Sequence, residues 1–342
     1  MRMVSRRDIK RVKRLAFETL DPKCDPATRK AAESLRRRVA RWSKESPDFV
    51  GVGVAEQTTK GQKKGAPALK VYVRKKRARN RVPKSRLAPR FLTVAGARIP
   101  IDVEEIGNPR TEVEYYTHER RRPVGPGLGI GRKDEAWGFG TFGCLVRSTD
   151  ASDRSVYLLS CAHVLAANGL GRNGDPIYQP APEGTRRLAD NIIARLARYQ
   201  PFDFSTPDFP HAIDAAIARL EPGVARSNLI PYYGAIGPPK TSQPKQVRMF
   251  GAATGARVGD VLDPHFYGDI EFDHPQGGRR KLRFENIVYC TKYSDNGDSG
   301  AVVLDAEDGG LVGLHFAGSE SASFYIRIGA IFSILQVELW RP

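Results

Sequence analysis

Short runs of apolar and β-branched residues, separated by turn residues, fill the chain beyond residue 135 and constrain its fold more than any other feature. Such runs between clusters of Gly, Pro, Asn and Asp are typical of strands, and their density predicts an all-β sandwich or barrel. Apolar residues at 328, 331, 332, 335 and 339 follow helical spacing, so we expect a closing helix over 328–339. The strand-like runs cover 143–147, 156–160, 215–220, 287–290, 301–304 and 311–314.

The region before residue 107 shows helical spacing first and strand-like alternation afterwards. A capping pattern at Ser5 and a second at Asp25-Pro26 each precede apolar residues at helical spacing, which predicts a basic helical hairpin. Alternation over 50–54, 69–73 and 99–103 predicts the strands of a small α+β unit, and the polar, Gly- and Pro-rich stretch that follows is composed like a linker. We therefore expect a basic helical segment over 1–47, a small α+β domain over 48–106, a linker over 107–135 and the main domain over 136–342.

Positive charge is concentrated at the start of the chain. Residues 1–100 hold 29 Lys and Arg against 8 Asp and Glu, whereas 101–342 hold 26 against 30, and the whole chain of 342 residues carries a net +17. The basic residues 1–100 predict a non-specific nucleic-acid partner, a protein partner that docks there, or simply a solvated surface. Because the main domain is mildly acidic, the overall charge says little about its substrate.

The apolar segments are too short to cross a membrane. No run approaches the roughly 18 apolar residues that a bilayer requires, and charges follow the start of the chain where a signal sequence is apolar. We therefore expect a soluble, cytoplasmic protein with no membrane partner. The cysteines at 24, 144, 161 and 290 lack the close pairs of metal sites, so we expect idle thiols, no metal and no other cofactor, with a Cys144–Cys161 disulfide as the alternative.

The tetrapeptide Gly297-Asp298-Ser299-Gly300 has the composition of a tight turn that presents a nucleophile. Glycine adopts backbone conformations that other residues avoid, so the amides of Gly297 and Ser299 can point at one spot, as an oxyanion hole requires. Ser299 is therefore a candidate nucleophile. The alternative is an ordinary Asx-type turn between two strands.

Two further residues have the chemistry that such a serine needs. His163 follows the apolar run 156–160 after two intervening residues, and Asp214 directly precedes the run 215–220. Hydrolysis through a serine requires a histidine base and a carboxylate that orients it, and a buried aspartate in turn needs a partner such as an imidazole. Each residue alone is compatible with a structural role at a strand end; the combination with Ser299 is what indicates catalysis.

In chain order, the segments Ser-Cys-Ala-His163, Ile-Asp214-Ala-Ala-Ile and Gly-Asp-Ser299-Gly resemble the three signatures of chymotrypsin-like (trypsin-fold) serine proteases over about 136–342. The resemblance implies a mainly β fold, a chymotrypsin-like double β-barrel with a C-terminal helix, and a serine endopeptidase that cleaves a protein or peptide substrate through an acyl-enzyme. It assigns His163 as general base, Asp214 as the orienting carboxylate, Ser299 as nucleophile, and the amides of Gly297 and Ser299 as the oxyanion hole. The alternative is a catalytically inactive or latent trypsin-fold binding module that docks protein or nucleic acid through its basic N-terminal region.

The sequence also departs from the secreted members of that family. Those members usually carry a cysteine just after the histidine and another shortly before the serine, and neither is present here, which favours the intracellular or bacterial branch. Secreted members also become active when a freed N-terminus is buried against the acid at the Asp298 position, and the sequence shows no sign of such processing. The 48–106 unit, followed by a Gly-Pro-rich stretch and Gly140-Thr-Phe-Gly143, is loosely similar to NARROW LEAF 1-type trypsin-like proteins.

A histidine after the serine indicates a substrate preference. The segment Gly313-Leu-His315-Phe316-Ala-Gly318 resembles a pattern in chymotrypsin-like members that cleave after Glu or Gln, with His315, Phe316 and Gly318 in the wall of the substrate pocket. An imidazole there can donate a hydrogen bond to a side-chain carbonyl or carboxylate. We therefore predict cleavage after Glu or Gln.

Two alternatives to this preference stay open. A trypsin-like pocket requires an acid where Tyr293 stands, although Asp295 is close enough in sequence to keep cleavage after Arg or Lys possible. The structural alternative for His315 is a strand histidine that packs against Tyr325 or Phe324. Tyr293 itself is a candidate substrate-binding residue.

Overall fold

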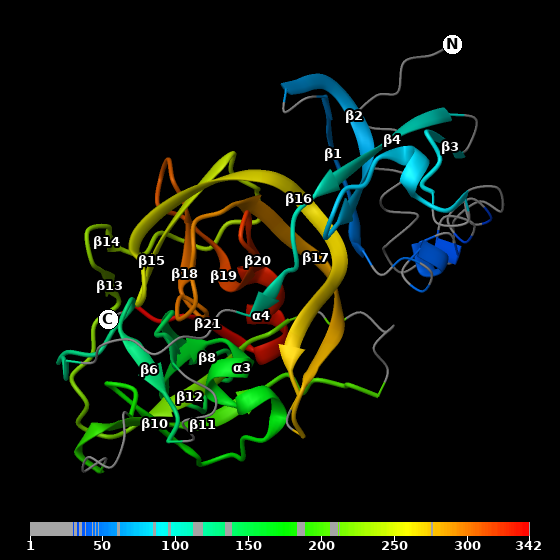
Figure 1. The fold of residues 1–342 in the computed structure, drawn as a ribbon. Helices are drawn as coiled ribbons and strands as arrows, with labels where there is room; N and C mark the ends of the chain where they lie inside the picture. Colours follow the sequence, from blue (N-terminus) through cyan, green and yellow to red (C-terminus); the bar gives the residue numbers. More distant parts are fainter. Residues whose placement is uncertain are drawn as a thin grey trace. The chain divides into compact units, whose positions relative to one another are not determined.

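The computed structural model divides into two compact units, and the residues that it describes run from 30 to 341 with several gaps. The first unit contains Met1–Pro109 with His265–Asp269, and the second contains Arg110–Pro264 with Ile270–Pro342 (Figure 1). The predicted bounds 1–47, 48–106, 107–135 and 136–342 stay a prediction. The described residues are 30, 33, 36–37, 39–42, 44, 46, 48–59, 62–84, 87–94, 97–111, 119–133, 139–182, 189–205, 211, 213–274 and 276–341.

The first unit is built around a group of paired strands. β1 (Phe49–Thr59) is antiparallel to β2 (Gln62–Val73), β2 is parallel to β4 (Ala97–Glu105), and β4 is antiparallel to β3 (Phe91–Val94). Residues 265–269 from later in the chain pair with β1, with Gly51 opposite Gly268. The strands expected at 50–54, 69–73 and 99–103 lie within β1, β2 and β4, and a short 3-10 helix, η1 (Arg79–Arg81), follows β2.

The core of this unit combines strand residues with helical ones. Lys70 is buried among the apolar side chains, but its ammonium donates to Asp102 at 2.7 Å and to Glu104 at 2.8 Å, which offsets the cost of burying a charge. The predicted first helix lies outside the described residues. The buried cluster consists of Val39, Trp42, Phe49, Val52, Leu69, Val71 and Ile99.

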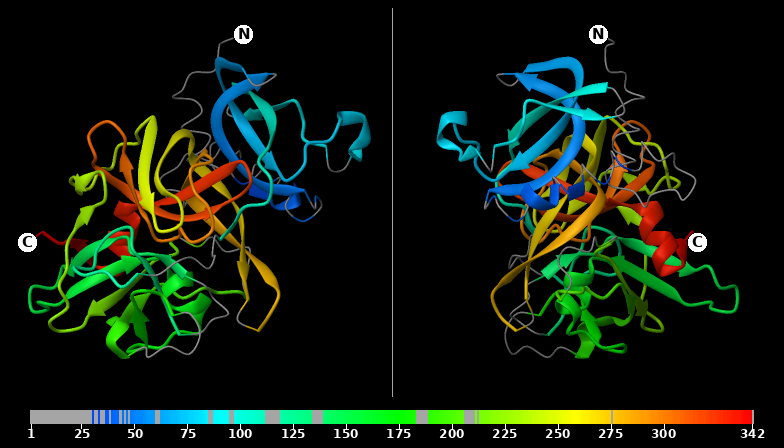
Figure 2. Two further views of the ribbon diagram at one scale, coloured as in Figure 1. Left: turned by 60° about the vertical axis from the view of Figure 1, so that its left-hand side comes forward. Right: turned by 90° about the vertical axis from the view of Figure 1, so that its right-hand side faces the viewer.

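Two β-sheets form most of the second unit, and both views of Figure 2 show the green sheet beside the yellow-to-red one. The green sheet has the order β21-β8-β9-β12-β11-β10-β6-β7. The short helices α3 (Ala162–Leu165), η4 (Ala167–Gly169) and η5 (Ala189–Asn191) connect some of its strands. The strands are β6 (Gly129–Gly131), β7 (Phe139–Thr141), β8 (Cys144–Ser148), β9 (Val156–Ser160), β10 (Pro176–Tyr178), β11 (Ile192–Tyr199), β12 (Ala216–Leu220) and β21 (Val337–Leu339).

The second sheet curls round until its outer strands pair. Its strands follow the order β15-β18-β19-β20-β17-β16, and β16 also pairs with β15, with Gln246 opposite Asp260 and Gly251 opposite Gly255. A sheet whose end strands pair in this way forms a barrel. The strands are β15 (Gln246–Gly251), β16 (Gly255–Asp273), β17 (Arg279–Thr291), β18 (Val302–Asp305), β19 (Leu311–Gly318) and β20 (Ala322–Arg327), with β5 (Arg110–Thr111) beside β16 and β19, and β13 (Leu229–Ile230) paired with β14 (Gly234–Ala235).

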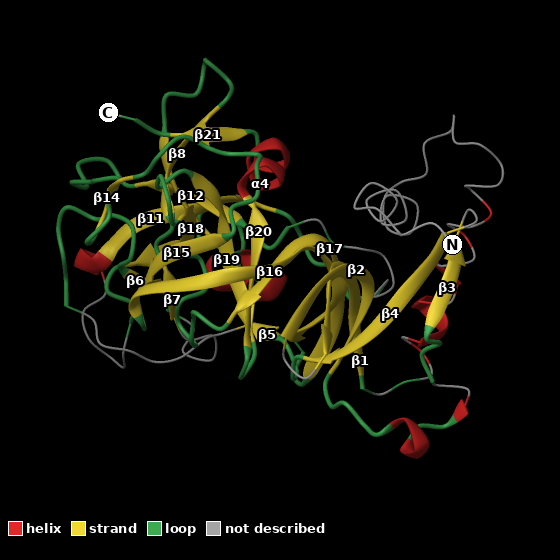
Figure 3. Cartoon of the chain, turned by 90° about the horizontal axis from the view of Figure 1, so that it is seen from above, coloured by secondary structure: helices red, strands yellow, loops and turns green. Residues whose placement is uncertain are grey.

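The predicted mainly β fold with a closing helix is confirmed (Figure 3). All six strand-like runs overlap strands of the second unit, and α4 (Ile328–Leu335) is the closing helix. The predicted end of this helix at 339 is wrong, because Gln336 has a left-handed backbone (φ 51°) and β21 then pairs with β8. In β21, Val337 and Leu339 are buried and Glu338 is exposed, so a strand period has replaced the helical one.

Of the long hairpin that β16 and β17 form, only the part of β17 at 287–290 was predicted from the sequence. β16 mixes charged residues and glycines with apolar ones, and many of its side chains are half-buried, so the contrast between its two faces is weak in the sequence. The hairpin is the yellow and orange arm in Figure 1. None of the helices that the structure describes is long and apolar enough to span a bilayer.

Candidate active site

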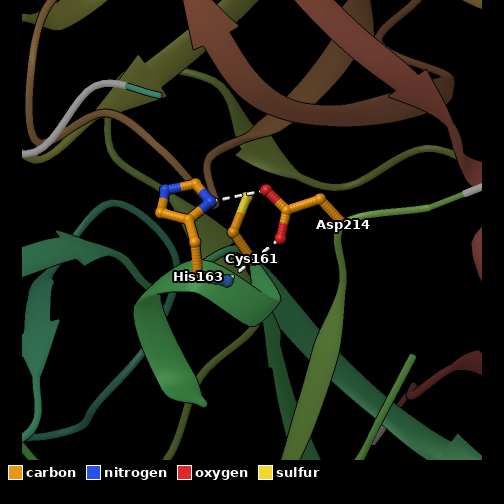
Figure 4. Close-up of side chains that lie close together, drawn as sticks. All are labelled: Cys161, His163 and Asp214. Carbon is orange, nitrogen blue, oxygen red and sulfur yellow. Dashed lines mark hydrogen bonds and ion pairs between the residues drawn. The ribbon is translucent and has the colours of Figure 1, made fainter. Parts of the chain in front are cut away.

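His163 and Asp214 lie at the same end of two neighbouring strands of the green sheet. β9 ends at Ser160 and leads into α3, which carries His163, whereas Asp214 stands just before β12. β9 and β12 are antiparallel neighbours with Ala216 opposite Ser160, so the end of one strand lies beside the start of the other. This pairing brings the two residues together from positions far apart in the sequence. Figure 4 shows the imidazole directed at the carboxylate.

The two side chains form a buried, doubly hydrogen-bonded pair. Nδ1 of His163 lies 2.5 Å from Oδ2 of Asp214, and the backbone N–H of His163 donates to Oδ1 at 3.0 Å. His163 is 2% exposed and Asp214 is fully buried. Within the described part of the chain, Nε2 of His163 has no hydrogen-bond partner. With the proton held on Nδ1 by the carboxylate, Nε2 is the atom able to accept a proton.

Ser299 stands in a tight turn between β17 and β18. Gly297 and Gly300 have φ values of +96° and +97°, a region that favours glycine, and a Cβ on Gly297 would lie 2.5 Å from the ring of Phe139. Ser299 is buried, and its Oγ donates to the carbonyl of Phe316 at 3.3 Å. Since Nε2 of His163 accepts nothing from the described residues, the structure does not contain a Ser299–His163 hydrogen bond.

Hydrogen bonds from the green sheet hold this turn near the segment that carries the histidine. Thr141 donates its N–H to the Ser299 carbonyl at 2.8 Å and its hydroxyl to the Gly297 carbonyl at 2.9 Å. The carbonyl of His315 accepts both the amide of Gly300 at 2.8 Å and the thiol of Cys161 at 3.2 Å. Because Cys161 is two residues before His163, these bonds join the serine turn to the segment that carries the histidine.

Asp298, next to the serine, is held by several neutral donors. Its Oδ1 accepts the amides of Ala253 at 3.0 Å and Thr254 at 3.1 Å, and its Oδ2 accepts the Thr254 hydroxyl at 2.7 Å and the Asp295 amide at 2.9 Å. A Cβ on Gly251 would lie 2.0 Å from Oδ1, so this close approach requires glycine. Burial raises the pKa of Asp298, and the hydrogen bonds from Asp295 and Thr254 oppose that rise.

Thr254 and Thr141 are site residues that the sequence reasoning missed. Thr254 belongs to Gly251-Ala-Ala-Thr254-Gly255, where two glycines around small residues signal a tight turn. Nothing local indicates that this turn meets Asp298, because the two turns join different strands of the barrel, β15 to β16 and β17 to β18. Thr141 lies 156 residues before Gly297, so nothing local in the sequence links it to the serine turn either.

His315 lies in β19, fully buried, with its ring edge-to-face against Tyr293 at a centroid distance of 5.3 Å. Its cross-strand neighbour is Tyr325 on β20, whose hydroxyl donates to Gln243 at 2.9 Å. Phe316 follows on the same strand and supplies the carbonyl that Ser299 contacts, and Gly318 ends the strand. The structure therefore places the predicted pocket residues on or beside one strand, with His315 in contact with Tyr293.

Aromatic side chains from the β16–β17 hairpin cover the histidine. Phe272 approaches the His163 ring at 6.2 Å in an edge-on arrangement and stacks on Phe284 at 5.7 Å, and Phe284 meets Phe316 at 5.1 Å. These three phenylalanines are fully buried. The side-chain amide of Asn168 donates to the Asp273 carbonyl at 2.8 Å, so the end of β16 is bonded to the segment that follows α3. The hairpin thus places Phe272 against the His163 ring.

Cys161, His163 and Asp214 also bring three potential metal-ligand atoms within 4.8 Å of one another (Figure 4). The thiol of Cys161 donates to a carbonyl, and burial, followed by the charge of Asp214, raises its pKa well above the usual value. Metal binding requires the thiolate. The donor set therefore fits a hydrogen-bonded thiol beside a His–Asp pair better than a metal centre, and Cys144 and Cys290 are likewise buried free thiols.

No family model matches the sequence, and no curated protein matches it. Among solved structures, protease A of Thermobifida fusca is similar with a TM-score of 0.44 and 14% identity, covering 64% of this chain and 100% of that one. The Nocardiopsis protease is similar with a TM-score of 0.44 and 17% identity over 64% and 100%. Cellulomonas bogoriensis chymotrypsin gives a TM-score of 0.42 and 16% identity over 64% and 99%. Likenesses with TM-scores below 0.5 and identities below 25% do not show which reaction this chain catalyses.

Proposed function

We propose that this chain is a serine endopeptidase in which His163 is the general base, Asp214 orients it and Ser299 is the nucleophile. The observation that carries the proposal is the buried His163–Asp214 pair, in which both carboxylate oxygens are used and Nε2 is left able to accept a proton. A carboxylate that accepts from both the ring and the backbone of one histidine sets the orientation of that ring. This is the arrangement that activates a serine hydroxyl.

The reaction begins when the hydroxyl of Ser299 leaves the Phe316 carbonyl and turns to Nε2 of His163. Oγ then attacks the scissile carbonyl carbon while its proton passes to Nε2, and Asp214 stabilises the imidazolium that forms. The amides of Gly297 and Ser299 receive the oxyanion. The C–N bond breaks as Nε2 returns the proton to the leaving amine, and water, activated by the same histidine, hydrolyses the acyl ester.

The contacts of Asp298 support a Ser299 turn that keeps its conformation without an N-terminal ammonium bound to Asp298. In this proposal the amides of Ala253 and Thr254 and the Thr254 hydroxyl occupy the positions that an incoming ammonium would need. Val164 directly follows the histidine, and residues 291–298 before the serine contain no cysteine. Both features support the branch of the fold that lacks those bridges and that processing.

We further propose cleavage after Glu or Gln. What supports this is His315, which packs edge-on against Tyr293, the position where cleavage after Arg or Lys would require an acid. A substrate library profiled with the wild-type protein tests the preference. Glu or Gln before the scissile bond is the expected result, and Arg or Lys would overturn it.

A second candidate function is a latent or inactive binding module. The burial of Ser299 and His163, with Phe272 packed against the His163 ring, favours it, because a substrate carbonyl has to reach both side chains. The two candidates differ in what happens at Ser299 when a small electrophile is offered.

A fluorophosphonate probe decides between the candidates. Labelling of the wild type, absent from Ser299→Ala and from His163→Ala, supports the endopeptidase. Labelling of neither the wild type nor the Phe272→Ala variant, in which the cover is removed, would favour the inactive module, whereas labelling of Phe272→Ala alone indicates a latent enzyme.

A further inference from the structure

A cavity of about 580 Å³ lies within the first unit and is lined by residues of that unit. Its apolar surface comes mainly from the strands: Val73 of β2 and Ile101 and Val103 of β4 are only half-buried although they pack on the core of the unit. Leu87 and Ala88, after η1, add further apolar surface. The volume falls within the roughly 300–1,000 Å³ typical of ligand sites.

One short segment supplies a basic rim to this cavity. Lys75, Lys76, Arg77, Arg79 and Arg81 all line it and are all exposed. Of the described lining residues, Asp48 alone is acidic, and it is already paired with Arg77 at 2.8 Å. The rim therefore carries a clear excess of positive charge above an apolar floor.

Hydrogen bonds fix the backbone of this rim. The amide of Arg74 donates to the Asp48 carbonyl at 2.7 Å, and the amide of Lys76 donates to the Glu105 carboxylate at 2.8 Å. At the other end, the guanidinium of Arg79 donates to the Ala88 carbonyl at 3.1 Å. A basic segment held at both ends presents its charges in a set arrangement, which lowers the entropy lost when a partner binds.

We propose that this basic-rimmed cavity binds an acidic peptide segment of a partner protein, with an apolar side chain of that peptide inserted between Val73, Ile101 and Val103. Charge complementarity selects acidic residues on either side of the insert, and apolar burial supplies affinity. A nucleic acid fits less well, because bases need exposed aromatic faces for stacking. The aromatic residues of the lining, Trp42 and Phe49, are 6% and 3% exposed.

The binding test is separate from catalysis. Full-length protein with the Ser299→Ala substitution is titrated against a fluorescein-labelled peptide of the order Glu-Asp-Leu-Phe-Asp-Glu, and fluorescence anisotropy is measured. Two comparison peptides replace the acids by Lys and Arg, or the Leu-Phe pair by Gly-Ser. Failure of the endopeptidase proposal leaves this result unaffected, because no bond is cleaved in the experiment.

The expected result is saturable binding of the first peptide and at least tenfold weaker binding of both comparison peptides. The affinity for the first peptide should also fall clearly between 50 and 300 mM salt, a range that spans Debye lengths of about 13 to 6 Å. Binding should also fall at least tenfold in the variant with Lys75→Glu, Lys76→Glu and Arg81→Glu. The matched control reverses Lys133, Arg154 and Lys245, which are exposed on the second unit, and should bind as the parent does.

Apolar anchoring is tested with Leu87→Ser, a half-buried position outside the buried cluster of this unit, and binding should weaken several-fold. Circular dichroism establishes that each variant is folded. No binding of the first peptide, equal binding of the three peptides, unchanged affinity in the rim variant, or displacement of the peptide by a thymidine oligonucleotide at lower concentration would overturn the proposal.

Discussion

The His163–Asp214 pair and the Ser299 turn are both buried, but they are held in different ways. The first is a direct contact between two side chains at adjacent strand ends. The second is a backbone conformation, set by two glycines and by hydrogen bonds from Thr141 at the end of β7 and from Thr254 in the turn between β15 and β16. One half of the site thus depends on a single pair of functional groups, and the other depends on the assembled barrel.

This difference predicts two kinds of mutational response. A change in the side-chain pair should remove chemistry and leave the fold intact, because the pair is small and its replacement can be isosteric. A change in the contacts of the turn should alter stability and catalysis together, because the same hydrogen bonds position Ser299, the proposed nucleophile, and join segments of the fold.

The largest effect is expected for Asp214→Asn. The amide keeps the shape of the carboxylate but stabilises the wrong tautomer of His163, so hydrolysis and fluorophosphonate labelling should fall about 10³- to 10⁴-fold. The melting temperature should change little by comparison. Asp190→Asn, at an exposed acid of η5, is the control and should behave as wild type. A loss of less than tenfold for Asp214→Asn would remove this pair from the mechanism.

Thr254→Val should give the next largest effect. It removes the hydroxyl that donates to Asp298 at 2.7 Å, so kcat should fall about 10- to 100-fold with little change in KM, since the turn acts mainly on the transition state. The free energy of unfolding should fall by about 1–3 kcal/mol. Thr254→Ser restores the hydroxyl and should recover most of both. Equal losses in the Val and Ser variants would mean that packing, rather than the hydrogen bond, holds the turn.

Phe272→Ala tests the cover over the histidine. Removing the ring should expose His163 and raise the rate of fluorophosphonate labelling several-fold, while the cavity lowers the free energy of unfolding by about 3–5 kcal/mol. Phe324→Ala, at another fully buried ring that stacks on Tyr289, is the matched control. It should be destabilised similarly without faster labelling, and faster labelling in both variants would point to general loosening instead.

The smallest effect concerns His211, whose amide donates to the Arg283 carbonyl at 2.6 Å beside the covering Phe284. Burial lowers the pKa of His211 from about 6.5, with Asp203 opposing the shift. The unfolded chain therefore takes up a proton at a higher pH than the folded one, so this contribution to stability is present above about pH 6.5 and decreases as the pH falls below it. The decrease in melting temperature between pH 7.5 and 5.5 should be smaller in His211→Gln; an identical decrease would show that another group is responsible.

The fold class and the candidate chemical groups could be predicted from the amino-acid sequence. Strand-like runs between turn residues predict a mainly β domain, because alternation records which face of a strand is buried. The order of His163, Asp214 and the Gly-Asp-Ser299-Gly tetrapeptide along the chain identified the candidate site, because an imidazole, a carboxylate and a hydroxyl are the groups that serine catalysis requires. The closing helix was predicted too, although Gln336 ends it earlier than the apolar spacing indicates.

How those residues are held and covered could not be predicted in this way, because it depends on contacts between distant segments of the chain. That Thr254 binds Asp298 and that Phe272 covers His163 depends on the pairing of β15 with β16 and on the path of a hairpin whose sequence has little contrast between its faces. Hydrogen bonds and ring contacts between distant segments leave no local pattern, because neither partner needs a special residue type in its own neighbourhood. The basic run at 75–81 is evident in the sequence, whereas the apolar cavity beneath it arises only when β2 and β4 pair.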